Sequence, residues 1–356
     1  KPVRKAAVKA KARTTKVVAK KVRAAPGKLR LTMMTGDYDI VRALKDGTVK
    51  PKGIDLVMGD YPGTHFIHRK VSSGKGCDIN EFNGGAYVVM KHHGAEFTSL
   101  PVFLHRRFRH SFIYINKARV KSPADLVGAR IGASSIGAAA NYWMRGYLED
   151  VGVPHRSVTW VIDSEDLAAK QAPKDLKIEV VKGRDTRQML LDGEVDAMIA
   201  PSITPMIGLG DPRVGRLFPN HKEVETAYYR KTGFFPIMHV TTIPSEIVAR
   251  YPWVVESLTL AFEEAKQLAY VRVANPRNVP LAWSMAEREE ELALLGEDPW
   301  EYGLSARNQA NYGQLVKYVH EQVLTGPCPT LEDLFPKEAF ELKLPLPVLH
   351  KPSYNF

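Results

Sequence analysis

The feature that most constrains the fold is a regular alternation of short apolar strands and helical segments between residues 28 and 200. Leu29–Met33 alternates apolar and polar residues as a strand does, and Gly36–Asp39 turns from it into a helix. The same order of strand, turn and helix returns at Cys77–Gly85 and again at Ala129–Gly137. Strands that alternate with helices at this spacing predict an α/β architecture.

The length of the chain indicates that this architecture is divided into two lobes. A chain of 356 residues is longer than one hydrophobic core usually supports. We predict that the stretch Phe108–Asn116, FRHSFIYIN, leads the backbone out of the first lobe, and that the apolar run Phe234–Val240 leads it back. The predicted limits are residues 28–116 and 237–340 for lobe 1, 117–236 for lobe 2 and 341–356 for a C-terminal extension.

The net charge of +11 belongs to an N-terminal arm and not to the folded body. Residues 1–30 hold 12 of the 50 Lys and Arg and no acid, which leaves 38 basic residues against all 39 acidic ones. With no acidic partner and few large apolar groups, residues 1–27 predict a basic, disordered arm. Such an arm can contact nucleic acid or an acidic surface, or it can pack within a homo-oligomer. A nucleic-acid footprint over the body is not supported.

The cysteines and the apolar runs bear on the compartment. Cys77 and Cys328 lie far apart, so they give neither a disulfide framework nor a metal-ligand spacing. The N-terminal cations are not followed by the apolar segment of a secretory signal, and no apolar run approaches the roughly 18 residues of a membrane-spanning helix. We therefore expect a cytoplasmic protein.

Several local motifs, taken together, resemble those of the 4,5-dihydroxyphthalate decarboxylase family between Leu31 and about Phe335. No single motif is specific, but their number and order are. The matching segments are Gly36–Asp39 (GDYD), Lys52–Leu56, Pro101–Asn116 (PVFLHRRFRHSFIYIN), Asp211–Val214, Arg216–Pro219, Ala227–Gly233 (AYYRKTG), Phe235–His239 (FPIMH), Pro252–Val254, Asp298–Trp300 and Tyr302–Leu304.

The resemblance implies a fold similar to the type II periplasmic substrate-binding proteins. In that fold two α/β lobes are joined by two crossings, here near Asn116–Ser122 and near Thr232–Val240. Two segments depart from the family pattern. Members carry Glu-Tyr-Gln where this chain has Ser134–Gly137, and often Arg-Pro-Pro where it has Ser202–Thr204. Both segments are expected to face the cleft between the lobes, so the resemblance does not define the identity of the substrate.

Ligands in such folds bind between the lobes, at the carboxyl ends of strands and the N-termini of helices. We expect His110, Asp37 and Glu81 to meet there as proton-handling groups. Asp37 is equally well placed to cap a helix. The residues expected to bind substrate are Arg109, Tyr38, Asn83, Ser134, Ser135, Gly137, Ser202 and His239.

Three of these assignments have alternatives. Ser134–Gly137 offers helix N–H groups that suit a carboxylate, but it also fits an ordinary helix cap. Arg109 fits a structural salt bridge, and His239 fits a satisfied core histidine. The pairs His65/His68 and His92/His93 are interpreted as exposed.

The resemblance implies a non-oxidative decarboxylase that acts on a dihydroxylated aromatic acid, a small partner molecule held in the cleft. Such a reaction needs no cofactor in principle. Asp, Glu and His also suit a divalent metal, although no HxxxH or CxxC spacing supports one. The alternative is a non-catalytic solute-binding protein of the type that serves ABC transporters. A weaker alternative is a ligand sensor that the arm recruits to nucleic acid.

Overall fold

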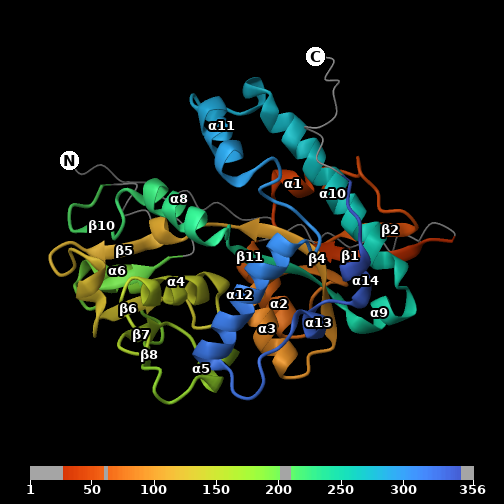
Figure 1. Ribbon diagram of the computed structural model, residues 1–356. Coiled ribbons are helices and arrows are strands. Elements are labelled where there is room, and N and C mark those ends of the chain that lie inside the picture. Colours follow the sequence, from red (N-terminus) through yellow and green to blue (C-terminus); the bar gives the residue numbers. More distant parts are fainter. Residues whose placement is uncertain (1–26, 60–62, 201–209, 346–356) are drawn as a thin grey trace, which may run out of the picture.

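The computed structural model describes residues 27–59, 63–200 and 210–345. Two sheets organise these residues, with helices packed around both (Figure 1). The predicted arm, except Gly27, lies outside the described residues, as do Ser202–Thr204 and most of the predicted C-terminal extension.

The first sheet has five strands in the order β2 (Ile54–Met58), β1 (Leu29–Met34), β3 (Ile79–Asn83), β11 (Ile237–Pro244) and β4 (Phe97–Arg106). The strands β1, β2 and β3 run parallel, and β11 lies antiparallel between β3 and β4. The late strand β11 is therefore inserted between β3 and β4 in a sheet whose other strands lie between residues 29 and 106.

The second sheet has six strands in the order β10 (Val214–Arg216), β5 (Ile113–Asn116), β9 (Ala197–Ile199), β6 (Arg130–Ala133), β7 (Thr159–Ile162) and β8 (Ile178–Val180). Because β5 belongs to this sheet, the chain passes from one sheet to the other over residues 107–112. This passage overlaps the stretch Phe108–Asn116 that was predicted to lead the backbone out of the first lobe, and it lies ahead of Asn116–Ser122 by the length of one strand. The predicted domain limits stay predictions.

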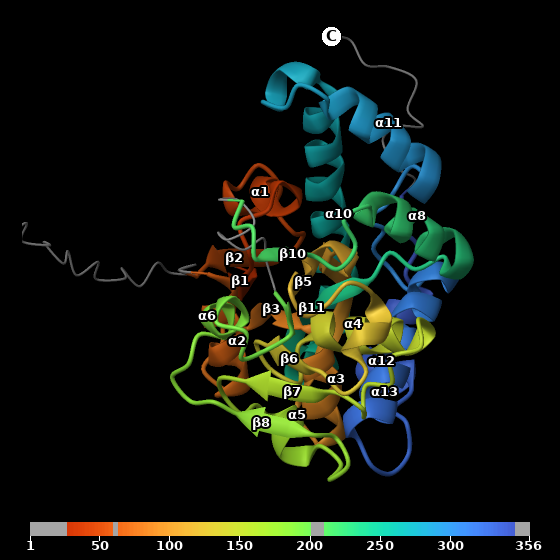
Figure 2. The same ribbon diagram turned by 90° about the vertical axis from the view of Figure 1, so that its left-hand side faces the viewer.

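Helices α1 to α6 and α8 lie between the strands along the chain, α9 to α14 follow the last strand, β11, and α11 projects away from the sheets (Figures 1 and 2). Their bounds are α1 Asp39–Lys45, α2 Thr64–Ser72, α3 Gly84–His92, α4 Ala139–Asp150, α5 Leu167–Gln171, α6 Thr186–Leu191, α8 His221–Thr232, α9 Ser245–Arg250, α10 Trp253–Ala274, α11 Ser284–Leu295, α12 Ala306–Val323, α13 Leu331–Leu334 and α14 Lys337–Glu341. Three 3₁₀ turns, His110–Phe112, Pro123–Leu126 and Pro276–Asn278, complete the described elements.

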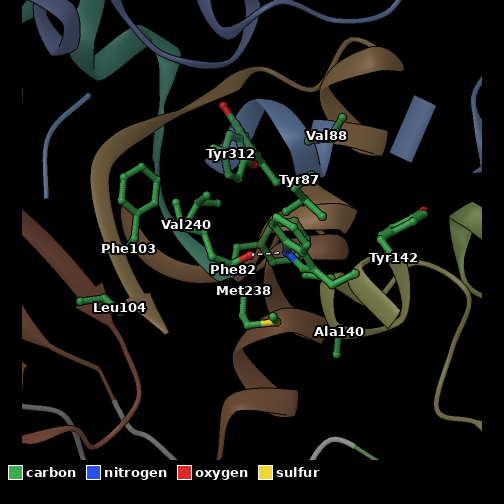
Figure 3. Packing of buried hydrophobic residues seen from close by; sticks show 14 of the residues in the cluster. Phe82, Tyr87, Val88, Phe103, Leu104, Ala140, Tyr142, Met238, Val240 and Tyr312 are labelled. Atoms are coloured by element: carbon green, nitrogen blue, oxygen red, sulfur yellow. Dashed lines mark hydrogen bonds between the residues drawn. The ribbon is translucent and has the colours of Figure 1, made fainter. Parts of the chain in front are cut away.

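One hydrophobic core runs through the contact region of α3, α4, α12 and β11, which Figure 3 shows from close by. Tyr312 on α12 donates a hydrogen bond to the Gly84 carbonyl (3.1 Å), and Trp143 on α4 donates one to the Ile237 carbonyl (3.0 Å). Both donors are fully buried, and each finds its hydrogen-bond acceptor on the backbone inside the core. These bonds fix α4 against β11 and α12 against the start of α3.

A buried ionic network fixes the long helix α10. Lys266 is fully buried and lies 2.9 Å from a Glu263 oxygen and 2.6 Å from an Asp298 oxygen. Its ammonium also sits 4.5 Å from the centre of the Tyr302 ring. The Asp-Pro-Trp segment that begins at Asp298 is thereby held onto α10.

Candidate active site

A buried carboxylate, Glu81 on β3, is the centre of the candidate site. Its side chain is fully buried and accepts three hydrogen bonds. The donors are the Gly36 backbone N–H (2.6 Å), the Tyr38 hydroxyl (2.8 Å) and Nδ1 of His239 (2.5 Å). Gly36 and Tyr38 follow β1, which runs parallel to β3, so the carboxyl ends of the two strands bring these groups together.

Sheet register places His239 beside Glu81. In the antiparallel pair β3–β11, Thr241 lies opposite Glu81 and His239 lies opposite Asn83, so Glu81 and His239 are diagonal neighbours on one face. On the other side of β11, His105 of β4 lies directly opposite His239. The β4–β11 register shifts on both sides of this pair, an irregularity that often re-aims side chains at active sites.

The environment keeps Glu81 ionised. Burial alone raises the pKa of the carboxyl, but the hydrogen bond and positive charge of His239, with the Gly36 and Tyr38 donors, outweigh it and leave the pKa below its ordinary value. Because Nδ1 of His239 faces the carboxylate, Nε2 is the ring nitrogen that points away from it.

Two further histidines surround His239. The rings of His68 on α2 and His105 on β4 meet the His239 ring edge to face, with centroids 4.8 and 4.6 Å away. Burial lowers the pKa of both, and the positive charge of His239 lowers it further, so both rings are neutral near pH 7. In the described part of the chain, Nε2 of His68 and Nδ1 of His105 are buried without a hydrogen-bond partner.

We call Gly36, Tyr38, His68, Glu81, His105 and His239 the Glu81 cluster. Of its five side chains other than the glycine, Tyr38, Glu81 and His239 were predicted from the sequence, whereas His68 and His105 were not. His68 was interpreted as exposed, which is wrong because its ring packs against Phe82 and His239. His105 was not singled out, although it lies within the long family-like motif.

The structure does not bring Asp37 or His110 to Glu81. The Asp37 side chain is 82 % exposed and pairs with Lys45 (3.3 Å), and the cap position of α1 is Tyr38, so Asp37 is neither a buried acid nor the helix cap. His110 is buried against Tyr147 and Tyr228, with Nδ1 3.7 Å from a Glu225 oxygen. The partners that the structure gives Asp37 and His110 are thus Lys45 and Glu225, and a joint role of the two with Glu81 stays a prediction.

Arg109 is buried close to the cluster. Its guanidinium lies over the Phe112 ring, 5.2 Å from the centroid, and its charge lowers the pKa of His105. Burial and repulsion by Arg107 lower the pKa of Arg109 to about 10, so it remains a cation at neutral pH.

The other predicted binding residues have structural partners. Asn83 caps α3 by accepting from Gly85 and Ala86 (3.0 and 3.1 Å), and it also accepts from Ala139 at the start of α4 (3.1 Å). It thereby joins the two helix starts.

The predicted carboxylate position at Ser134–Gly137 is filled by the chain itself. The Gly137 N–H donates to Asp166 (2.7 Å), and the Ser135 carbonyl accepts from Asn141, while Ser134 is exposed. This helix start does hold a carboxylate, but that carboxylate belongs to the protein. Ser202 cannot be placed, because it lies outside the described residues.

Within the described ranges, no three His, Cys, Asp or Glu side chains are arranged to hold a metal ion. Nor does any helix of the described residues have the length and apolarity needed to cross a membrane.

Comparison with known proteins agrees with the fold and defines the family. The fold is that of the type II periplasmic binding proteins. The structure matches the periplasmic aliphatic sulphonate binding protein SsuA from Escherichia coli with a TM-score of 0.51 and 14 % identity, over 89 % of this chain and 96 % of that one. This likeness confirms the predicted fold class.

Two curated relatives are more informative, although no protein-family model matches the chain. The chain is 31 % identical over 290 residues to the 4,5-dihydroxyphthalate decarboxylase of Comamonas testosteroni, which covers 78 % of this chain and 88 % of the relative. It is 32 % identical over 217 residues to the enzyme of the same name from Pseudomonas putida. This match covers 58 % of this chain and 84 % of that relative. The chain belongs to the 4,5-dihydroxyphthalate decarboxylase family, as the sequence motifs predicted.

Proposed function

We propose that the protein is a cofactor-independent decarboxylase of a dihydroxylated aromatic acid, and that the Glu81 cluster handles its protons. The observation that carries the proposal is the ionised, fully buried Glu81 that accepts from His239 Nδ1. A carboxylate in this position fixes the ring orientation and stabilises the imidazolium, as the acid does in other acid–histidine pairs. Membership of the decarboxylase family supports the reaction class.

The neutral histidines fit the first step. An aromatic carboxylate loses CO2 readily only when electron density is pushed onto the ring carbon that bears it. Removal of a phenolic proton para or ortho to that carbon supplies the push. Among the described residues, the cluster has two neutral imidazoles with an unpartnered nitrogen, His68 and His105. Because burial lowers the pKa of both, either ring shares this proton within a hydrogen bond and does not hold it as an imidazolium.

His239 fits the second step. Its protonated Nε2 donates a proton to the ring carbon, and the bond between that carbon and the carboxylate then breaks. The bonding electron pair returns to the ring, aromaticity is restored and CO2 leaves. The phenolic proton goes back to its oxygen, so one proton is consumed for each CO2 released. Glu81 holds the imidazolium before transfer, and the buried Arg109 suits a substrate carboxylate.

The test compares His239→Gln with His110→Gln, using 4,5-dihydroxyphthalate and a panel of hydroxybenzoates and measuring CO2 release. We expect kcat to fall by about 10²–10⁴ in His239→Gln, because an acid–base group of this kind contributes that much. His110→Gln should stay within a few-fold of the wild type. Loss of turnover in His110→Gln together with full turnover in His239→Gln would refute the assignment.

The alternative function is non-catalytic solute binding, which the likeness to a sulphonate-binding protein favours. It predicts saturable binding of an aromatic acid with no CO2 release from any member of the panel. We further propose a cytoplasmic location, because the described cysteines, Cys77 and Cys328, are both free thiols.

A further inference from the structure

A concave site separate from the Glu81 cluster lies next to the segment 106–112 that connects the two sheets. It is a cavity of about 1070 Å³ between α8 and α11, which we call the α8–α11 cavity. Two views place α8 beside α11, and Lys222 of α8 pairs with Glu287 and Glu290 of α11 (Figures 1 and 2). Among the described residues that line this cavity, none belongs to the Glu81 cluster.

The end of β4 separates the two sites, because successive residues of a strand point to opposite faces. His105 faces the Glu81 cluster and packs against His239. The next residue, Arg106, lines the α8–α11 cavity and donates to the Glu301 carbonyl (2.7 Å) and to the Asn308 side chain (2.6 Å). Arg106 is only 2 % exposed, and its buried Nε has no hydrogen-bond partner in the described part of the chain.

The cavity contains cations that the protein does not neutralise. Arg107, Arg216 and Arg230 line it, and within residues 27–59, 63–200 and 210–345 no carboxylate lies within ion-pair distance of any of them. Of the four described acids that line it, three are already engaged, and the fourth, Glu291, lies on α11 without an ion pair to any of these arginines in the same ranges. Glu225 accepts from the Ser111 N–H (3.2 Å), and Lys222 is paired with the two α11 glutamates. The unmatched guanidinium groups favour an anionic ligand.

The wall beside these arginines is aromatic. Phe235 packs against Phe108 (5.0 Å between centroids) and against Trp300 (5.7 Å), and all three line the cavity. The Arg107 guanidinium lies 5.7 Å from the centre of the Phe112 ring, at the junction of the charged and aromatic surfaces. A ligand that satisfies both surfaces carries an anionic group on a flat apolar body.

We propose that the α8–α11 cavity is a second binding site, and that it takes an aromatic carboxylate. Guanidinium groups bind carboxylates through two parallel hydrogen bonds, and the ring of such a ligand packs on Phe108, Phe235 and Trp300. The cavity is large enough for a single-ring aromatic acid. The site is independent of the chemistry proposed for the Glu81 cluster.

Equilibrium dialysis of the full chain against phthalate tests this site. Phthalate has two carboxylates but no hydroxyl group, so no phenolic proton is available to the Glu81 cluster. The test variant is Arg107→Gln with Arg230→Gln, two exposed arginines for which the described residues offer no hydrogen bond to lose. The matched control is Arg69→Gln with Arg277→Gln, which removes the same charge from exposed sites outside the cavity.

We expect phthalate binding that survives in His239→Gln and in the control pair but weakens at least about tenfold in the Arg107/Arg230 pair, since each charge-assisted hydrogen bond is worth about that much. Equal melting temperatures for the two pairs will show that the fold is intact. Three results would overturn the site: no phthalate binding by the wild type, equal affinity in the two arginine pairs, or binding that is lost in His239→Gln. None of these results bears on CO2 release, so the proposed function stands or falls separately.

Discussion

Replacing Glu81 by Gln tests the centre of the candidate active site through stability. Glu81 accepts three hydrogen bonds in full burial, two of them at one oxygen and one, from Gly36 N–H, at the other. A Gln side chain has one acceptor oxygen, so its NH2 group must face a donor. An orphaned buried donor costs about 1–3 kcal/mol, and loss of the charge weakens the remaining bonds by a comparable amount. We therefore expect Glu81→Gln to lower the free energy of unfolding at pH 7 by about 3 kcal/mol.

The lowered pKa of Glu81 determines how the stability difference between the wild type and Glu81→Gln changes with pH. The folded-state pKa of Glu81 lies below the ordinary value of 4.5, so ionised Glu81 stabilises the fold fully above the unfolded-state pKa. That contribution disappears as the pH falls through the folded-state pKa. The stability difference between wild type and Glu81→Gln should thus be constant from pH 7 down to about pH 5 and shrink in more acid solution.

Urea unfolding followed by far-UV circular dichroism at pH 7, 5, 4 and 3 measures this difference. Glu289→Gln, at an exposed position of α11, is the matched control and should change stability by less than about 0.5 kcal/mol. A Glu81→Gln variant as stable as the wild type at pH 7, or one whose deficit grows in acid, would show that Glu81 is not the ionised acceptor described here.

Two further predictions concern packing, and denaturant unfolding measures both. Lys266→Met should cost about 3–5 kcal/mol, because it leaves two carboxylates without their buried cation, whereas Lys317→Met, at an exposed ion pair, should change stability by less than about 1 kcal/mol. Similar values for the two would contradict the buried network. Gly85→Ala places a Cβ 2.5 Å from the Tyr142 ring and should destabilise by about 1–3 kcal/mol. Gly313→Ala on α12, where no described atom lies within 4 Å of the new Cβ, should instead stabilise by up to about 1 kcal/mol, and the opposite order would refute the close packing of α3 on α4.

Local patterns in the sequence were sufficient for the elements and for their class. The alternation in Leu29–Met33 identified β1, and the apolar run at Phe234–Val240 identified the strand that becomes β11. These patterns are short-range, because a strand or helix needs only its own residues to show its period. The motif order also identified the family.

The candidate site depended on distances that no local pattern contains. His239 and Glu81 are 158 residues apart, and they meet because β11 inserts between β3 and β4 in one particular register. A shift of one residue would turn His239 to the other face of the sheet. The sequence ranked His239 below His110, because nothing near either residue reveals which strand it will face.

Solvent exposure of individual side chains was the second property that the sequence did not reveal. Asp37 and Tyr38 are neighbours, yet the tertiary structure leaves Asp37 in solvent and turns Tyr38 onto Glu81. By itself, the sequence determined an α/β chain of the decarboxylase family with a balanced body and a basic arm. Only the tertiary structure brought Glu81, His239, His105 and His68 into contact with one another, because burial and cross-strand contact are properties of the packed sheet and not of any one segment.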